Sequence, residues 1–189
     1  DMCLGLGIKI DGGKDSLSMA VKTRSPNGES VLVQAPGTLV FSAYADTPDI
    51  TRKATPDLKG IGNTLILVDL GHGRHRLGGS ALAQVFGQLG DVPPDADLAS
   101  LKRAFVTLQR LLREDLILSL HDRSDGGLIV TLLEMAFAGN LGLDISLTGP
   151  SSPVEMLFSE EPGVVIECAD PMKVMGILRQ ADVPSEIIV

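Results

Sequence analysis

Aromatic residues are scarce in this 189-residue sequence, which has no tryptophan, one tyrosine and five phenylalanines. Hydrophobic residues nevertheless make up 44% of it, so we expect a sizeable core built from aliphatic side chains. Basic residues are also few, at 16 against 24 acidic ones, and the net charge is −8. This balance argues against general binding to nucleic acid or to an anionic membrane surface, although it leaves room for a small phosphate ligand.

Cysteine is equally rare: Cys3 and Cys168 lie far apart, and no Cys-x-x-Cys pair occurs. The sequence therefore predicts no disulfide framework, and a reducing compartment such as the cytoplasm is the simpler expectation. No apolar run reaches the roughly 18 residues of a membrane-spanning helix, and the sequence shows no signal-peptide pattern. Because the chain starts within DMCLGLGIKI and stops after the apolar SEIIV, we expect both ends to be cuts through a larger polypeptide.

Proline and glycine divide the chain near residue 50. The polar, proline-interrupted segment TPDITRKATPDLKGIG separates residues 1–50 from residues 51–189, and we place a domain boundary there. The first part is predicted to be rich in strands, with one on each side of Gly12-Gly13 and another over residues 37–46. The turn RSPNGES predicts a hairpin, and the segment MCLGLG predicts the last turn of a helix ended by a glycine.

Strands and helices are mixed in the second part. Strands are predicted over residues 63–71, 116–120, 142–147, 163–168 and 185–189, and helices over 80–90, 98–115, 128–139 and 171–181. The helix over 98–115 has the clearest pattern, a stripe at spacings of three and four formed by Leu98, Leu101, Phe105, Leu108 and Leu112. This mixture predicts the α/β (α+β) class: a three-layer sandwich with a mixed sheet, preceded by a β-rich fragment.

The most unusual stretch is SLHDRSDGGLIV, in which a polar hinge separates a predicted strand from a predicted helix. The first N–H groups of a helix lack backbone partners and carry a partial positive charge, so they suit a phosphate. Ser124 adds a hydroxyl donor, the glycine pair permits close approach of the backbone, and Asp122 is a hard oxygen ligand suited to Mg²⁺. His121 and Arg123 are candidates to pair with a phosphate or with the neighbouring acids. The structural alternative is that Ser124 or Asp125 caps the helix while the other polar groups are solvated.

Three other polar segments each have a functional and a structural interpretation. In DGGKDSLSM, Lys14, Asp15 and Ser16 form a phosphate-friendly turn without the spacing of a P-loop, and a polar hairpin tip is the alternative. In GHGRHRLGGS, a basic cluster before a predicted helix start suits an anion, and a solvated loop is the alternative. In FSEEPG, Glu160 and Glu161 are either a second metal or substrate contact or a turn on the surface.

Four blocks of the chain, in this order, show a family resemblance: GGKDSLSM, LVFSAYADTPDITRKATPDL, LGGSALAQVFGQLGD and HDRSDGGLIVTLLEMAFAG. They resemble the large type of phosphoribosylformylglycinamidine synthase, whose ATP-using superfamily includes aminoimidazole ribonucleotide synthetase and selenophosphate synthetase. The resemblance covers essentially the whole chain, and the HDRSDGG and GGKDS blocks are highly specific to this family. It implies a fragment of an ATP-dependent carbon–nitrogen ligase of purine synthesis, which converts formylglycinamide ribonucleotide into formylglycinamidine ribonucleotide with glutamine as amido donor.

The resemblance also implies a place for the fragment in the intact enzyme, which has two synthetase-like halves followed by a glutaminase domain. Residues 1–50 resemble the tail of the second N-terminal-type subdomain, and residues 51–189 resemble the second C-terminal-type subdomain. The glutaminase site and the first half are not in this sequence. The fragment alone is therefore expected to be inactive, to contain no catalytic residue, and to work with the remaining domains of the same polypeptide.

The same resemblance implies the site residues. Asp122 is expected to ligate Mg²⁺ and Ser124 to contact the nucleotide, while Lys14, Asp15 and Ser16 resemble the substrate-facing loop. The partner Mg²⁺ ligands are expected before residue 1. The expected ligands are thus Mg²⁺ and ATP or ADP, with neither nucleic acid nor membrane as a partner. Two roles stay open for this second-half site: a catalytic one, and a non-catalytic scaffold that holds an auxiliary ADP.

Overall fold

The computed structural model describes residues 2–16, 18–35 and 37–189. The chain divides into two compact units, residues 1–49 and residues 50–189. Leu17, part of the strand predicted after Gly12-Gly13, lies outside the described residues. Within the described ranges, no helix is both long and apolar enough to cross a membrane.

The first unit contains a short helix and a β-hairpin. Helix α1, Met2–Leu6, ends at Gly7, whose φ of 74° is the left-handed conformation typical of a glycine after a helix. Strands β1, Ala20–Arg24, and β2, Ser30–Gln34, pair antiparallel around a turn in which Gly28 has a φ of 82°. The helix end and the hairpin predicted from the sequence are thus confirmed.

Two other strand predictions for the first unit are wrong. Residues 8–10, before Gly12-Gly13, and residues 37–46 have no regular structure. A strand needs backbone hydrogen bonds to a neighbour, and the two-stranded hairpin is the only sheet that the described part of this unit forms. None of the described residues of this unit is buried, so its apolar side chains form no core of their own.

The second unit is built around a four-stranded sheet. Its strands, in the order β4-β5-β3-β6, are β3, Thr64–Asp69; β4, Ser119–Asp122; β5, Gly163–Cys168; and β6, Ser185–Ile187. The prediction of a mixed sheet is wrong in this respect, because every neighbouring pair of described strands is antiparallel. β3 and β4 run in the same direction, but β5 lies between them and runs in the opposite direction.

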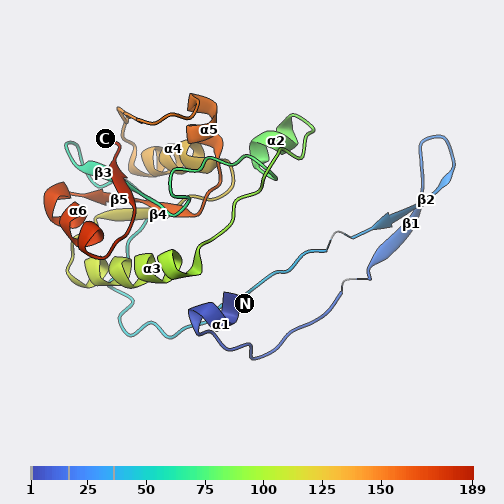
Figure 1. Cartoon of the computed structure of the whole chain (residues 1–189), viewed down its shortest axis with the longest axis horizontal. Coiled ribbons are helices and arrows are strands. Elements are labelled where there is room, and N and C mark those ends of the chain that lie inside the picture. Colours follow the sequence, from blue (N-terminus) through green and yellow to red (C-terminus); the bar gives the residue numbers. More distant parts are fainter. Residues whose placement is uncertain (1, 17, 36) are drawn as a thin grey trace. The chain divides into compact units, whose positions relative to one another are not determined.

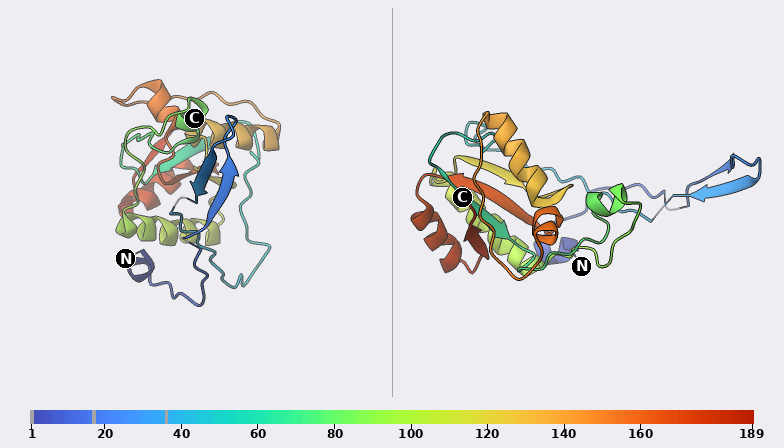
Figure 2. Two further views of the ribbon diagram at one scale, coloured as in Figure 1. Left: turned by 90° about the vertical axis from the view of Figure 1, so that its right-hand side faces the viewer. Right: turned by 90° about the horizontal axis from the view of Figure 1, so that it is seen from above.

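Helices cover both faces of this sheet (Figure 1, Figure 2). Helices α3, Leu98–Arg113, and α6, Pro171–Gln180, cover one face, and α4, Gly127–Gly139, covers the other. Of the two short helices, α5, Pro153–Phe158, packs against α4, and α2, Ala81–Val85, lies on a loop away from the sheet (Figure 1). Alternate side chains of β3 point to opposite faces: Ile66 and Val68 pack with α3 and α6, whereas Leu65 and Leu67 pack with α4. The predicted α+β class and the three-layer sandwich are therefore confirmed.

Helix α3 forms where the sequence predicts it, but its buried face is displaced by one position. The fully buried residues are Ser100, Ala104, Thr107 and Leu111. Of the predicted stripe, Leu101 and Leu108 are partly buried against the same core, whereas Phe105 is 62% exposed. Two of the buried residues are polar, so a search for apolar periodicity favours the neighbouring row. The Thr107 hydroxyl tolerates burial because it donates to the Arg103 carbonyl at 2.8 Å.

The strand predicted over residues 142–147 is also wrong. This segment is irregular, although the Ser146 N–H donates to the Ile188 carbonyl at 2.9 Å. Its apolar side chains Leu143, Ile145 and Leu147 pack on the α4 side of the sheet. The alternation in the sequence thus reflects side chains that alternate between core and solvent, without the ladder of hydrogen bonds that defines a strand.

Candidate functional site

The polar hinge of HDRSDGG lies at one edge of the sheet. Strand β4 ends with His121 and Asp122, and helix α4 begins at Gly127. Because β3 runs in the same direction as β4 and β5 runs in the opposite one, the end of β3 and the start of β5 share this edge. Three segments therefore meet here: the hinge loop, residues 122–127; the β3 loop, residues 70–81; and the β5 lead-in, residues 159–162.

Arg123 turns inward from the hinge loop, and its side chain is fully buried. Its Nη2 lies 2.6 Å from Asp69 Oδ1 at the end of β3, and its Nε donates to the Glu161 carbonyl at 2.5 Å. Arg123 thus pairs with an acid, but with the distant Asp69 and not with one of the neighbouring acids that the sequence suggested. The arginine joins the hinge loop to β3 and to the β5 lead-in.

Asp69 is held ionised by these contacts. Burial alone raises the pKa of its carboxyl group, but the charge of Arg123 and the hydrogen bonds from Gly73 and Gly71 outweigh burial. The net effect lowers the pKa of Asp69 below its ordinary value of 3.8. The Gly73 N–H donates to Oδ2 at 2.7 Å and the Gly71 N–H donates to Oδ1 at 3.1 Å. Asp69 thus holds two parts of the site in place, the side chain of Arg123 and the start of the β3 loop.

Asp122 lies at the surface of the hinge loop, with a side chain that is 72% exposed. The Nδ1 atom of His121 lies 3.2 Å from Asp122 Oδ1, and the Nε2 atom lies 2.8 Å from Glu134 Oε2 on α4. His121 is therefore held between two carboxylates, and Glu134 fixes the ring that orients Asp122. An oriented carboxylate that solvent can reach is accessible to a cation.

Helix α4 begins without a side-chain cap. Its N-cap residue is Gly126, which has no side chain to cap the helix; the Gly126 N–H donates to Glu160 Oε1 at 2.8 Å, and the Gly127 N–H donates to the backbone carbonyl of Ser124 at 2.9 Å. The side chains of Ser124 and Asp125 are both exposed. The interpretation of Ser124 or Asp125 as a helix cap is therefore wrong, and the exposed Ser124 lies just before the start of a 13-residue helix.

The glycine pair of the hinge is required by close packing within the protein. Gly126 and Gly127 have φ values of 87° and 74°, which side chains rarely tolerate. A Cβ atom on Gly126 would lie 2.3 Å from Val130 Cγ2, and one on Gly127 would lie 2.6 Å from the carbonyl carbon of Phe158. The close approach predicted for this pair is thus made by the start of α4 against α5.

The acidic pair of the β5 lead-in is not a surface turn. Glu161 is fully buried, and its two oxygens accept hydrogen bonds from Arg76 Nε at 2.6 Å and Arg76 Nη2 at 2.7 Å. Glu160 Oε1 accepts from the backbone N–H groups of Ala81 and Gly126, each at 2.8 Å. Both acids therefore bind donors of the protein. Arg76, part of the basic cluster predicted for an anion, is held by Glu161.

The substrate-loop candidates belong to the first unit. Lys14 and Asp15 are exposed, Ser16 is partly buried, and the Lys14 ammonium donates to the Ser16 hydroxyl. The alternative of a hairpin tip is wrong here, because the strand predicted before Gly12-Gly13 does not form. The substrate-facing role of these residues stays a prediction.

The described ranges contain no group of three or more His, Cys, Asp or Glu side chains that could hold a metal ion. Asp122 is the predicted ligand, and it is a single exposed carboxylate. Mg²⁺ binds through one or two carboxylates and otherwise through water and phosphate oxygens. The described residues of this chain therefore do not fit a complete Mg²⁺ site, and Asp122 fits one ligand of a site that would need phosphate or other segments to complete it.

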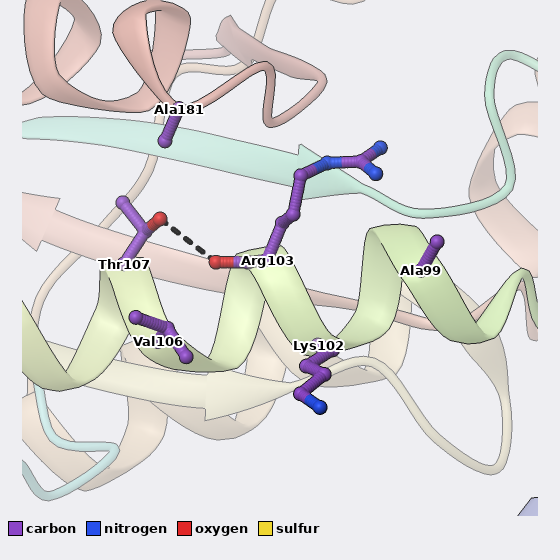
Figure 3. Close-up of a pocket in the computed structure, with 6 residues that line it drawn as sticks. All are labelled: Ala99, Lys102, Arg103, Val106, Thr107 and Ala181. Atoms are coloured by element: carbon purple, nitrogen blue, oxygen red, sulfur yellow. Dashed lines mark hydrogen bonds between the residues drawn. The ribbon is translucent and has the colours of Figure 1, made fainter. Parts of the chain in front are cut away.

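Two grooves lie away from the hinge. One, of 430 Å³, runs along α3 beside Lys102, Arg103 and Thr107 (Figure 3). Lys102 and Arg103 extend to opposite sides of the helix in this view, so their charges do not converge on one ligand. The other groove, of 730 Å³, is lined mainly by apolar side chains of α4 and of residues 140–145, and Phe137 at its rim is 68% exposed.

Two features of this region were not predicted from the sequence. Helix α5 starts with a capping box, in which the Glu155 N–H donates to Ser152 Oγ at 3.3 Å and the Ser152 N–H donates to the Glu155 carboxylate at 2.8 Å. The pattern SSPVE, a serine with glutamate three residues later and proline at the first helical position, is a signal that would have identified it. The second feature is the role of Asp69. Its signal in the sequence, a single acid at the end of an apolar strand, is weaker than that of the capping box.

Comparison with known families follows the same division of the chain. A family model described as "AIR synthase related protein, C-terminal domain" matches residues 60–188, and one described as "FGAR-AT PurM_N-like domain" matches residues 1–46. The first of these matches covers nearly the whole of the second unit. The chain belongs to the family of AIR synthase related proteins, of which it contains the C-terminal domain.

Relatives of known name confirm the resemblance seen in the sequence. The chain is 53% identical to "Probable phosphoribosylformylglycinamidine synthase, chloroplastic/mitochondrial" of Arabidopsis thaliana, over 97% of this chain and 13% of that protein. It is 52% identical to "Phosphoribosylformylglycinamidine synthase" of Homo sapiens, over 94% of this chain and 13% of that protein. A protein of that name from Dictyostelium discoideum is 46% identical, over 100% of this chain and 15% of its own length. The chain therefore spans only about 13–15% of these relatives.

Solved structures share the fold at low sequence identity. "Structure of PurLQS from Thermotoga maritima" covers 99% of this chain and 29% of its own, with a TM-score of 0.64 and 16% identity. "T. maritima PurL complexed with ATP" covers 74% of this chain and 23% of its own, with a TM-score of 0.57 and 18% identity. "T. maritima PurL complexed with FGAR" covers 99% of this chain and 31% of its own, with a TM-score of 0.59 and 13% identity. These likenesses establish the fold.

Proposed function

We propose that this chain is the part of a phosphoribosylformylglycinamidine synthase that supports a nucleotide in its second synthetase-like half. In the whole enzyme, ATP phosphorylates the amide oxygen of formylglycinamide ribonucleotide, and ammonia from glutamine displaces the phosphate. The products are the amidine, ADP, phosphate and glutamate. The support is the 46–53% identity to relatives of this name over nearly the whole chain. Because the chain spans only about 13–15% of those relatives, the reaction is assigned to the longer protein.

The domain assignment follows the proposed parent. Residues 1–50 are the tail of the second N-terminal-type subdomain, and residues 51–189 are the second C-terminal-type subdomain. The matched family ranges, 1–46 and 60–188, and the division of the chain after residue 49 support this assignment. The proposed partners are the remaining domains of the same polypeptide, and the proposed compartment is the cytoplasm.

The start of α4, whose N-cap is a glycine, is the single observation that supports a nucleotide at the hinge most strongly. Gly126 provides no side-chain cap, although Glu160 accepts from its N–H, and the exposed Ser124 lies beside the first turn, so a phosphate there gains hydrogen bonds and the helix dipole. Asp122 on the same loop is the proposed Mg²⁺ ligand, and Ser124 is the proposed nucleotide contact. Mg²⁺, when bound, neutralises phosphate charge. Neighbours of this fold described as PurL complexed with ATP, ADP and AMPPCP support the choice of nucleotide.

The role proposed for Lys14, Asp15 and Ser16 is a contact with the substrate. Two of the three side chains are exposed, and a lysine with a hydroxyl neighbour suits the phosphate of a ribonucleotide. A structure of the same fold described as PurL complexed with FGAR covers 99% of this chain, which includes this segment.

The test of the proposed function is an assay of the longer protein with formylglycinamide ribonucleotide, glutamine and Mg²⁺–ATP. Formation of the amidine together with ADP and glutamate is expected, and the absence of amidine would sink the assignment. The isolated chain supplies one carboxylate of the Mg²⁺ site, so calorimetry should detect no ATP binding at micromolar concentrations. Tight stoichiometric binding to the isolated chain would contradict the idea of a shared site.

A second candidate is a non-catalytic scaffold that holds an auxiliary ADP. It is favoured by the hinge itself, in which Arg123, Glu160 and Glu161 all bind groups of the protein. Asp122→Asn in the longer protein separates the two candidates. Unchanged turnover per folded molecule with a lower melting temperature supports the scaffold. Reduced turnover at constant stability supports a catalytic site.

A further inference from the structure

Glu160 makes a contact that the nucleotide site by itself does not explain. One of its oxygens, Oε1, accepts hydrogen bonds from two backbone groups of different loops, the Ala81 N–H and the Gly126 N–H, each at 2.8 Å. Ala81 lies at the end of the β3 loop, and Gly126 immediately precedes α4. A single acceptor atom therefore keeps these two nitrogens within two hydrogen-bond lengths of each other.

The segment that presents Glu160 is itself firmly held. The neighbouring residue Glu161 is fully buried and bound to Arg76 through both oxygens, and its carbonyl accepts from Arg123 Nε. On the other side, the Ser159 N–H donates to the Glu155 carbonyl at 3.1 Å, which ties the lead-in to the end of α5. Glu160 thus projects from a braced backbone, and the loops it contacts take their position from it.

Gly126 is the residue through which this brace reaches the hinge. As the N-cap of α4 it has no side chain to anchor it, and because it lacks a Cβ atom its backbone has more conformational freedom than that of other residues. The hydrogen bond to Glu160 restricts that freedom at the point where the first turn of α4 and Ser124 are oriented.

We propose that Glu160 is a positioning residue that fastens the hinge loop to the β3 loop and so fixes the orientation of Ser124 and of the first turn of α4. This inference rests on the proposed nucleotide site at the hinge. The role requires an acceptor oxygen at this position and does not require its charge. A glutamine should therefore replace Glu160, whereas alanine, with no acceptor, and aspartate, which is one methylene shorter, should not.

Hydrogen exchange in the ¹⁵N-labelled chain tests the brace directly. In Glu160→Ala and in Glu160→Asp, exchange at both the Ala81 and the Gly126 amides should accelerate by about tenfold, while Glu160→Gln should keep most of the protection. Glu155→Ala is the matched control, because it removes a neighbouring acid whose side chain binds the Ser152 N–H in the capping box of α5 and accepts from neither the Ala81 nor the Gly126 amide. Acceleration at only one amide, or at neither, overturns the proposal. If Glu160→Ala does not fold, Glu160→Asp provides the same test.

A titration with millimolar Mg²⁺–ATP, followed by amide chemical shifts, connects the brace to the ligand. We expect shifts at Ser124 and in the first turn of α4, with a dissociation constant raised by about fivefold or more in Glu160→Ala and nearly unchanged in Glu160→Gln. Tighter binding by Glu160→Gln would mean that the carboxylate repels the phosphate, which overturns the positioning role. Absence of shifts in the wild-type chain counts against the proposed nucleotide site, and the exchange rates alone then decide the role of Glu160.

Discussion

Arg123 and Asp69 form a buried ion pair with a distance of 2.6 Å between Nη2 and Oδ1, although 54 positions separate them in the sequence. Within the HDRSDGG motif, this pair separates a buried residue from its exposed neighbours. Arg123 points into the protein and joins the hinge loop to β3, while Asp122 and Ser124, on either side of it, are exposed. The buried pair therefore presents the two predicted ligand-binding residues on a fixed loop.

The first prediction concerns the stability that this pair contributes. Arg123→Met leaves the Asp69 carboxylate buried without its partner, which typically costs about 3–5 kcal/mol in the free energy of unfolding. Urea denaturation of the isolated chain measures this loss. The double variant with Asp69→Asn should be less destabilised than the sum of the two single variants, since no charge is then left unpaired. A loss below about 1 kcal/mol in Arg123→Met would contradict this account of the hinge.

The second prediction is a pH dependence with a defined sign. Although burial raises it, the pKa of Asp69 is on balance lowered below 3.8 in the folded chain by Arg123 and two backbone donors. The ionised carboxylate therefore stabilises the fold fully above its ordinary pKa, and this contribution is lost as the pH falls through the lower folded-state pKa. Melting temperatures of the wild type and Asp69→Asn, measured from pH 7 to pH 2, should differ by a constant amount at neutral pH and converge in acid. A difference that grows in acid would contradict the sign of the shift.

The third prediction compares one glycine from each of two Gly-Gly pairs, Gly127 of the hinge and Gly13 of the first unit. Gly127→Ala places a Cβ 2.6 Å from a backbone atom of α5 at a positive φ, so it should lower the free energy of unfolding by about 3 kcal/mol. Gly13→Ala is the control, because no atom lies within 4 Å of a Cβ there. Its effect should stay within about 0.5 kcal/mol. Equal effects of the two substitutions would show that the hinge glycine is not required by packing.

The fourth prediction concerns the two units. Every buried side chain of the described residues lies within residues 58–189, and both core clusters belong to the second unit. Deleting residues 1–50 should therefore leave a monomer that unfolds cooperatively, with a melting temperature close to that of the full chain. Circular dichroism and size-exclusion chromatography provide the check. An unfolded or aggregated product would place the domain boundary elsewhere.

The sequence predicted the elements whose signals are local. β3, β5 and the helices α3, α4 and α6 follow from apolar runs, periodicity and caps, and each lies within a few residues of its predicted range. The predictions over residues 37–46 and 142–147 failed because a strand depends on a neighbouring strand, and β propensity alone does not supply one. The buried face of α3 was misplaced because Ser100 and Thr107 are polar.

In the candidate site, too, features that depend on distant partners could not be predicted from the sequence. The sequence located the hinge between a strand and a helix, and the structure places Asp122 and Ser124 on one exposed loop there. It could not decide that Arg123 turns inward, because that depends on Asp69, which is distant in the chain. The roles of Glu160 and Glu161 depend likewise on donors 34 to 85 positions away, which no local pattern reveals.

The central claim is that the hinge loop is half of a Mg²⁺–nucleotide site, and the affinity of the longer protein for Mg²⁺–ADP tests it most directly. Asp122→Asn removes the proposed Mg²⁺ ligand and Ser124→Ala removes the proposed nucleotide contact. Both side chains are exposed, so neither change should disturb folding. With Asp125→Asn as the exposed control from the same loop, calorimetry should show affinity weakened by about tenfold or more in the first variant, and by a smaller factor in the second. Wild-type affinity in both Asp122→Asn and Ser124→Ala would contradict the claim.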